Sequence, residues 1–190
     1  MELNFVTVVS GLPRSGTSMM MQALEAGGMP ILTDNIRKSD QDNPKGYFEF
    51  EPVKKTKDDP SWVQVAAGKA VKMVYRLLYD LPHDYEYRVI FMNRNIVEIM
   101  ASQRAMLERT GQQGANISDE KLTQLFEKDL EKIYQWVNQQ GNFSMISIGY
   151  KDMVQEPLPQ CRRVNDFLGN CLDIDKMTST VDASLYRNRR

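Results

Sequence analysis

The chain has 190 residues, a length that favours a single domain able to bury about 70% of the surface its unfolded chain would expose. Hydrophobic residues make up 42% of it and charged residues 26%, which is typical of a folded globular protein and not of a disordered one. The formal net charge is -1, so no overall field would attract nucleic acid or an anionic membrane, and an anion-binding site must be local.

The cysteine and histidine content is low. Cys161 and Cys171 lack a C-x-x-C spacing, and His83 is the only histidine. We therefore expect no His/Cys metal site, and both thiols to be reduced and structural. The amino-terminal run carries an acidic Glu2 and is too short for a signal peptide or a membrane span, which predicts a cytoplasmic protein.

The first predicted elements are a strand, a loop and a helix. Residues 5–10 form a β-branched run that predicts a buried strand, and helical spacing begins at Thr17 and stops at Gly27-Gly28. Residues 34–61 are polar, apart from an aromatic cluster at 46–50, and are predicted to form a long excursion. Excursions of this length inside a compact domain tend to be functional.

Strands and helices alternate over the rest of the chain. Further strands are predicted at 70–74, 87–93 and 143–150, and helices at 96–108, 121–139 and 158–168. The alternation predicts an α/β fold, with a mostly parallel central sheet between two layers of helices, in one domain of residues 1–190. Ligands of such sheets bind at the carboxyl ends of the strands, and the candidate residues below follow those ends.

The segment GLPRSGTS, residues 11–18, lies where a P-loop would join the first strand to the first helix. It matches G-x-x-x-x-G-K-[ST] except that Thr17 stands in the place of the lysine. Backbone N–H groups at a helix amino terminus still form an anion cradle, and hydroxyl groups add donors. The sequence thus predicts a P-loop NTPase-like fold and a phosphate-binding loop made by Pro13, Arg14, Ser15, Gly16, Thr17 and Ser18. A plain strand-to-helix turn is the alternative.

The end of the strand at 87–93 argues against a nucleoside triphosphate as the ligand. Enzymes of that kind hold Mg²⁺ with an aspartate at the end of a neighbouring strand, whereas this strand ends in Asn93-Arg94. A cation in this place favours an anion that is bound directly by arginine, with no metal required.

Four segments resemble, in order, those of sulfotransferases that use 3'-phosphoadenosine 5'-phosphosulfate (PAPS). GLPRSGTS resembles the 5'-phosphosulfate loop in its arginine-containing form, as in tyrosylprotein-type and small bacterial members. NPKGYFE, residues 43–49, resembles a segment of small bacterial members. RVIFMNRNIVEIMAS is similar to the 3'-phosphate segment, and ISIGYKDMVQEP looks like the Tyr-x-Asp segment that ends in proline.

The resemblance implies an enzyme that moves a sulfuryl group from PAPS to a hydroxyl-bearing acceptor, which would be a small molecule, a glycan or a peptide. It implies that Arg94 and Ser102, eight residues apart, clamp the 3'-phosphate, and that Tyr150 lies near the adenine. The alternatives are a surface ion pair of Arg94 with Glu98, a solvated Ser102, and a core or interface tyrosine at position 150.

Sulfuryl transfer needs an in-line hydroxyl, a base and positive charge near the reacting oxygens. Arg14, inside the loop, is the first candidate for the charge. Lys72 is the second, because the family has a lysine on the strand that precedes the 3'-phosphate strand. An ordinary snorkelling lysine is the alternative for Lys72.

The residue expected to act as general base differs from that of the best-known members of the family. Cytosolic members carry a histidine two residues after the lysine, where this chain has Val74. Glu49 is the candidate instead, since its aromatic neighbours would desolvate its carboxyl group. A strand at 46–50 with alternate solvated residues is the alternative, and His83 is expected in a surface loop.

The carboxyl-terminal segment also differs from that of the family. The family's Arg-Lys-Gly element is absent, and the chain ends SLYRNRR, so Arg187, or another arginine of this tail, would supply its charge unless the tail is frayed. The acceptor pocket is expected from residues 34–69 and 108–120. Two alternative functions remain. One is a protein that binds PAPS or 3'-phosphoadenosine 5'-phosphate (PAP) without catalysis, and the other is an atypical P-loop kinase.

Overall fold

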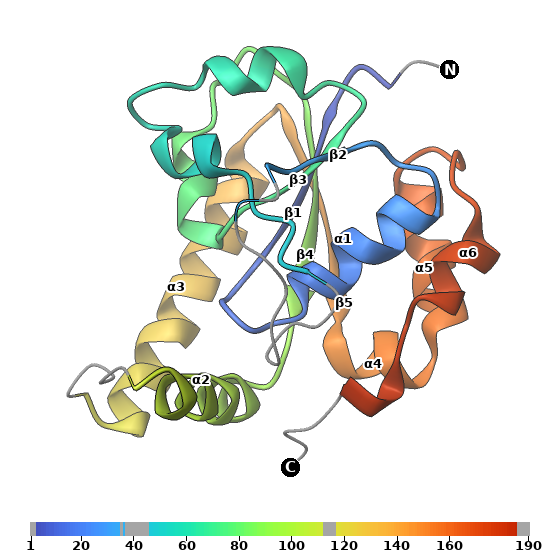
Figure 1. Cartoon of the computed structure of the whole chain (residues 1–190). Coiled ribbons are helices and arrows are strands. Elements are labelled where there is room, and N and C mark those ends of the chain that lie inside the picture. The colour runs from blue at the N-terminus through green and yellow to red at the C-terminus, as the bar shows by residue number, and fades with distance from the viewer. Residues whose placement is uncertain (1–2, 35, 37–45, 112–116, 186–190) are drawn as a thin grey trace.

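A computed structural model describes residues 3–34, 36, 46–111 and 117–185 of the chain. Its centre is a five-stranded sheet in the order β2-β3-β1-β4-β5, and every neighbouring pair of strands is parallel (Figure 1). The strands are β1 (Val6–Gly11), β2 (Ile31–Leu32), β3 (Ala70–Lys72), β4 (Tyr87–Asn93) and β5 (Phe143–Gly149). The predicted α/β fold with a parallel sheet is confirmed.

The burial of the central strand β1 explains why this strand could be predicted from the sequence. All six residues of β1 are buried, because helices cover both faces of the sheet, and such strands appear as continuous apolar runs. The edge strand β2 was not predicted, since two residues carry no periodicity.

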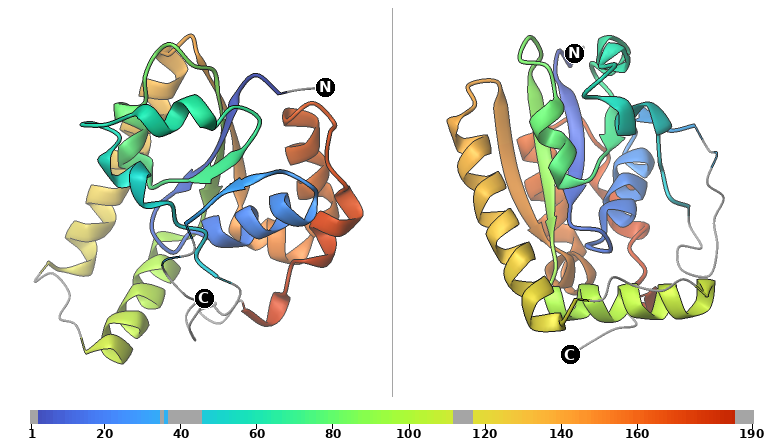
Figure 2. Two further views of the ribbon diagram at one scale, coloured as in Figure 1. Left: turned by 45° about the horizontal axis from the view of Figure 1, so that its top comes forward. Right: turned by 90° about the vertical axis from the view of Figure 1, so that its left-hand side faces the viewer.

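Two apolar clusters, one on each face, give the molecule three layers (Figure 2, right). On one face lie α1 (Thr17–Ala26), α5 (Pro157–Phe167) and α6 (Ile174–Ser179), which pack against Val9 and Ile90. On the other face lie α3 (Asp119–Gln139) and residues of the 51–81 segment, which pack against Val8, Val89 and Phe91. Successive strand residues alternate between these two clusters, as the pleat requires.

The remaining helices frame the carboxyl edge of the sheet. Helix α2 (Ile96–Thr110) follows β4 and is capped by Asn95, whose side-chain oxygen accepts a hydrogen bond of 2.9 Å from the Val97 N–H. Helix α4 (Tyr150–Gln155) follows β5 without a loop, so the prediction that Tyr150 ends a strand is wrong. Short 3-10 helices occupy Glu51–Lys55, Ser61–Val65, Tyr75–Asp80 and Ala183–Leu185.

Several predicted boundaries move by a residue or two. Helix α5 begins at Pro157, where a proline suits the first helical position, and not at Leu158. Helix α6, one and a half turns long, was not predicted. Among the helices that the structure describes, none has the length and apolar character needed to cross a bilayer.

Candidate functional site

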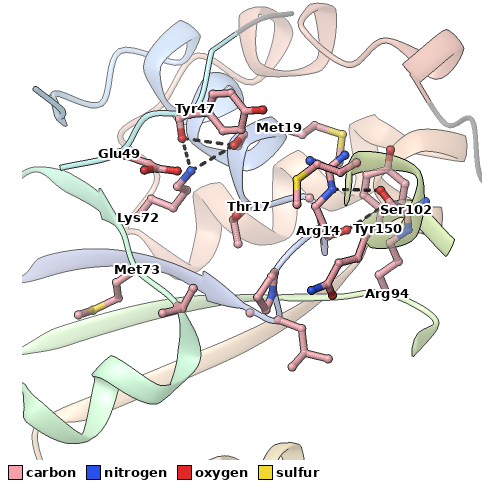
Figure 3. Close-up of a pocket in the computed structure, with 18 of the residues that line it drawn as sticks. Arg14, Thr17, Met19, Tyr47, Glu49, Lys72, Met73, Arg94, Ser102 and Tyr150 are labelled. Atoms are coloured by element: carbon pink, nitrogen blue, oxygen red, sulfur yellow. Dashed lines mark hydrogen bonds between the residues drawn. The ribbon is translucent and has the colours of Figure 1, made fainter. Parts of the chain in front are cut away.

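The carboxyl ends of four strands open into one cavity of about 610 Å³ (Figure 3). Gly11 ends β1 and Lys72 ends β3, while Arg94 and Tyr150 come directly after β4 and β5. All of them line the cavity. Residues 80 or more positions apart in the sequence therefore meet because the strands are parallel and end at the same edge.

The loop after β1 has a backbone that only certain residues can adopt. Gly16 caps α1 with φ 102°, and a Cβ atom there would lie 2.4 Å from the Tyr150 ring. Arg14, with φ 69°, is one of the few described residues other than glycine with a positive φ. Alternation of such residues turns successive N–H groups toward one side, which is the geometry of an anion nest.

Helix α1 presents its amino terminus to the cavity. Gly16 has no side chain to accept hydrogen bonds from the first turn, and that turn contains no acidic residue. Thr17 and Ser18 line the cavity beside these N–H groups. The positive end of the helix dipole, the N–H groups and the Thr17 hydroxyl thus favour a bound anion, whereas the Ser18 hydroxyl donates to the Tyr47 carbonyl at 3.3 Å.

Ser15 differs from the rest of the loop. Pro13, which is exposed, and the loop residues other than Ser15 line the cavity, but the Ser15 side chain is buried behind them. Its N–H donates to the Leu12 carbonyl at 3.1 Å, and its hydroxyl oxygen, among the described residues, has no hydrogen-bond partner. The side chain of Ser15 therefore does not face the cavity, and the contribution of Ser15 to the phosphate-binding loop stays a prediction. Ser15 closes the turn.

Arg14 joins the loop to α2. Its Nε donates to the hydroxyl of Ser102 at 3.0 Å, across 88 residues of sequence (Figure 3). Ser102 is only 3% exposed. The alternative of a solvated Ser102 is thus wrong, since its hydroxyl faces the loop and the cavity.

Arg94 lies in a buried network. Its Nε is 3.0 Å from the Glu98 carboxylate, and the two side chains are 8% and 5% exposed. Another nitrogen of the guanidinium donates to the Arg14 carbonyl at 3.2 Å. The predicted alternative of a pair with Glu98 is therefore present, but the pair is buried and not on the surface.

Tyr150 completes the network around the loop. The Arg94 guanidinium carbon lies 4.3 Å from the centroid of the Tyr150 ring, and the other part of this ring packs against Gly16. Arg94 thereby contacts the loop through both a hydrogen bond and a shared aromatic ring. The conformation of the loop is thus held by Arg94, which follows β4, by Ser102 of α2 and by Tyr150 of α4.

Lys72 points from β3 toward the loop. Its Nζ donates to the carbonyl oxygen of Tyr47 and to the hydroxyl of Ser18, at 3.4 Å in the second case (Figure 3). It also lies 5.8 Å from the centroid of the Tyr47 ring. The snorkelling alternative is thus wrong, because the ammonium group is turned into the cavity and held there.

Glu49 lies opposite Lys72 on an irregular segment. Its carboxylate lines the cavity, is about one-fifth exposed, and lies 3.7 Å from Nζ of Lys54. Residues 46–50 do not form a strand, because Phe48 has φ 53° and breaks the alternation. Phe48 packs on the sheet, whereas Phe50 packs edge-on against Trp62, so the strand alternative is wrong.

The wall beyond Lys72 is mostly apolar. Phe50, Val53, Met73, Val74 and Leu77 line it. The expected pocket segment 34–69 therefore contributes, but the expected segment 108–120 contributes only Arg109 among its described residues. Residues 73–77, which were not expected, take its place. His83 is exposed outside this cavity, as its predicted surface loop requires.

The sequence interpretation missed the residues that extend the cavity on its other side. These come from α1, α2 and the segment after α6, and are Met19, Gln22, Gln103, Ala105, Met106, Thr180 and Asp182. The helical spacing of Ser102, Met106 and Arg109 was a readable signal for part of this set. Arg187 lies outside the described residues.

The electrostatic character of the cavity differs from that of the whole chain. Among the described residues, five basic side chains line it, namely Arg14, Lys54, Lys72, Arg94 and Arg109, against the two acidic side chains of Glu49 and Asp182. A local excess of positive charge thus exists in a chain whose net charge is -1. Within the part of the chain that is described, no group of three or more His, Cys, Asp or Glu side chains is placed to hold a metal.

No protein-family model and no curated protein matches the sequence. Solved structures do match. A mouse sulfotransferase, SULT7A1, complexed with PAP has a TM-score of 0.57 at 17% identity over 97% of this chain, and this chain covers 64% of that one. The sulfotransferase domain of the Synechococcus PCC 7002 olefin synthase has a TM-score of 0.54 at 12% identity, over 97% of this chain and 86% of that one.

A third structure, the sulfotransferase domain from the curacin biosynthetic pathway, has a TM-score of 0.52 at 15% identity, over 97% of this chain and 90% of that domain. Identities this low show a shared fold. The chemistry must be argued from the cavity itself.

Proposed function

We propose that this chain, whose fold is that of sulfotransferases, transfers a sulfuryl group from PAPS to the hydroxyl of an acceptor. One observation carries the proposal: an anion-binding loop without the nucleotide lysine shares a cavity with Arg94 and Lys72. A cation takes the strand-end place in which a triphosphate enzyme holds its metal-binding aspartate.

The chain's own groups fit such a donor. The uncapped amino terminus of α1 and the hydroxyl of Thr17 suit the phosphosulfate end, and Ser18 would serve it through its backbone N–H. Ser102 accepts a hydrogen bond from Arg14, and a hydroxyl that accepts one bond can still donate its own proton to a phosphate oxygen. Arg94 adds positive charge at the same place, and the Tyr150 ring offers an aromatic surface for a base.

When bound, PAPS supplies the sulfuryl group and a phosphate leaving group. Arg14 and Lys72 supply positive charge toward the oxygens on which negative charge increases. Lys72 is held by the Tyr47 carbonyl and by Ser18, so its ammonium group needs little reorganisation to act. Preorganised charge of this kind is commonly the largest contribution to catalysis.

Glu49 is the candidate that takes the proton of the acceptor hydroxyl. Its carboxylate lines the cavity together with Phe50 and Val53 of the apolar wall beyond Lys72. In this proposal that wall is the acceptor side of the cavity. Lys54, at 3.7 Å, is close enough to orient it. A base must lie within hydrogen-bond reach of the proton it removes, and the cavity gives Glu49 access to a hydroxyl placed between it and the loop.

Transfer of radiolabelled sulfate from PAPS tests the proposal. The chain would be incubated with labelled PAPS and a panel of phenols, aliphatic alcohols, glycans and tyrosine peptides, in EDTA. We expect a labelled product with at least one class, and none when Lys72→Met replaces the wild type. Tight binding of PAP with no product in any class would favour a binding protein without catalysis.

A further inference from the structure

One face of α2 continues the cavity beyond Ser102. Ser102, Met106 and Arg109 are spaced by four and three residues, so they lie above one another on the helix, and all three line the cavity. Arg109 is therefore the only arginine of α2 on this face. Arg104, also on α2, does not line the cavity and pairs with Asp119 of α3.

The Arg109 side chain leans back along α2 toward Ser102. Its Nε donates to the carbonyl of Ala105, one turn earlier, at 3.0 Å. Helical side chains point toward the amino terminus of their helix, which agrees with this contact. Because a helical carbonyl points toward the carboxyl terminus, the guanidinium group lies between the levels of Ala105 and Arg109, and so closer to Ser102 than the Arg109 backbone, which is about 10.5 Å of helical rise away.

The charge balance beside Ser102 calls for a further cation. A phosphomonoester carries roughly two negative charges at neutral pH. Arg14 is the nearest cation, since its Nε donates to the Ser102 hydroxyl at 3.0 Å, but the proposed function directs its charge toward the sulfuryl end of the donor. The charge of Arg94 is opposed by Glu98 at 3.0 Å in a buried pair, so a phosphate bound at Ser102 would lack a full complement of positive charge.

We infer that Arg109 is a further binding residue for the 3'-phosphate of the donor, in the place expected for the carboxyl-terminal arginines. The inference rests on the proposed function, because that function puts a 3'-phosphate beside Ser102. Arg109 then makes the contact from the far side of Ser102, opposite Arg94. The cavity thereby distinguishes nucleotides with a 3'-phosphate from those without one.

A purely structural role for Arg109 makes a different prediction. A cation in the last turn of a helix stabilises the carbonyl end through the dipole, so its loss would lower the melting temperature and leave ligand affinity unchanged. Nucleotide binding separates the two roles. The pair of probes is PAP, which has the 3'-phosphate, and adenosine 5'-monophosphate, which lacks it.

Isothermal titration calorimetry on the full chain tests the inference with Arg109→Gln and, as matched control, Arg104→Gln. We expect Arg109→Gln to weaken PAP by about tenfold, equal to about 1.4 kcal/mol, and adenosine 5'-monophosphate by less than about twofold. Arg104→Gln should change neither affinity. Unchanged PAP affinity in Arg109→Gln, or an equal loss for both nucleotides, would overturn the inference while the proposed function stands. No binding of PAP by the wild type would overturn both.

Discussion

The two sides of the cavity are built differently. On the donor side, Arg14, Arg94, Ser102 and Tyr150 contact one another, with Ser102 and Tyr150 buried and both arginines partly buried, and these contacts fix the loop conformation. On the acceptor side, residues 46–54 are irregular or 3-10 helical, and their contacts include a partly exposed ion pair of Glu49 with Lys54 and hydrogen bonds to the backbone carbonyls of Tyr47 and Glu49.

This difference suggests a division of roles. A preorganised donor side loses little conformational entropy on binding, so it should bind PAP in the absence of an acceptor. The acceptor side is held largely through the backbone carbonyls of Tyr47 and Glu49 and has an apolar wall, so its side chains can change in sequence without disturbing the donor side. Variants on each side should therefore affect different measurements.

The largest expected effect is that of Arg94→Met. The substitution leaves the buried carboxylate of Glu98 without its partner, which should lower the free energy of unfolding by roughly 3–5 kcal/mol. PAP binding should be lost as well. Urea denaturation and calorimetry measure the two effects.

The matched control for Arg94→Met is the double variant with Glu98→Gln. It should recover at least half of the lost stability, because the uncompensated charge is removed, but it should not recover PAP binding. If Arg94→Met alone were as stable as the wild type, the pair of Arg94 and Glu98 would not be what holds the donor side together.

Lys72→Met should separate binding from turnover. We expect PAP affinity to change by less than threefold and kcat to fall by about 10²–10³, the loss typical when one preorganised charge or donor is removed. Steady-state rates with the best acceptor of the panel, together with calorimetry, give both numbers. A parallel loss of PAP affinity would place Lys72 on the donor side.

Glu49→Gln should act only on the acceptor side. Loss of a general base lowers kcat by about 10²-fold or more, whereas PAP affinity should stay at the wild-type value. The rate as a function of pH is the measurement, and Glu51→Gln, on the exposed side of the Lys54 pair, is the control. Full activity of Glu49→Gln would assign the base to another residue.

Gly16→Ala tests how tightly the donor loop is packed. An alanine here would have to adopt φ 102° with its Cβ 2.4 Å from the Tyr150 ring, at a cost of about 1–3 kcal/mol. We expect a lower melting temperature and weaker PAP binding. Gly28→Ala shares the positive φ but has no neighbour within 4 Å of the added Cβ, so it should lower only the melting temperature.

Tyr75→Phe should have the smallest effect. Tyr75 begins the 3-10 helix that carries Leu77, and its hydroxyl donates to Asp129 of α3 at 2.6 Å. Burial, with Asp129 beside it, raises the Tyr75 pKa to about 12. Loss of this bond should cost about 1 kcal/mol at pH 8 and leave PAP affinity unchanged.

The pH dependence of the Tyr75→Phe effect follows from that pKa. A raised folded-state pKa contributes stability that is fully present below the ordinary tyrosine value of 10.0 and is lost as pH rises toward 12. The difference in stability between wild type and Tyr75→Phe should therefore shrink above pH 10. Urea denaturation at pH 8 and pH 11 measures it, and a constant difference would contradict the assignment.

The fold and most of the donor side could be predicted from the sequence for a physical reason. A buried parallel strand and the loop after it are local patterns, so β1, Arg14 and Thr17 could be recognised without tertiary information. The resemblance to sulfotransferases rested on such segments, and it is confirmed at the level of the fold.

The remaining features depend on tertiary packing. Nothing in the sequence of the loop tells that the Ser15 side chain turns inward, or that the pair of Arg94 and Glu98 is buried by Tyr150. The positive φ of Phe48 likewise prevents the strand that the alternating pattern of residues 46–50 suggested. Arg109 was expected only within the acceptor segment 108–120, because helical spacing gives a face but not what that face covers.

The central claim is that the cavity holds a phosphosulfate donor and not a triphosphate. The melting temperature of the wild-type chain tests it most directly, with PAP in EDTA and with ATP plus Mg²⁺. A ligand at about 100 times its dissociation constant adds about 2.7 kcal/mol of stability, which is a shift of several degrees for a chain of this size. We predict that shift with PAP and none with ATP plus Mg²⁺, and the reverse pattern would contradict the claim.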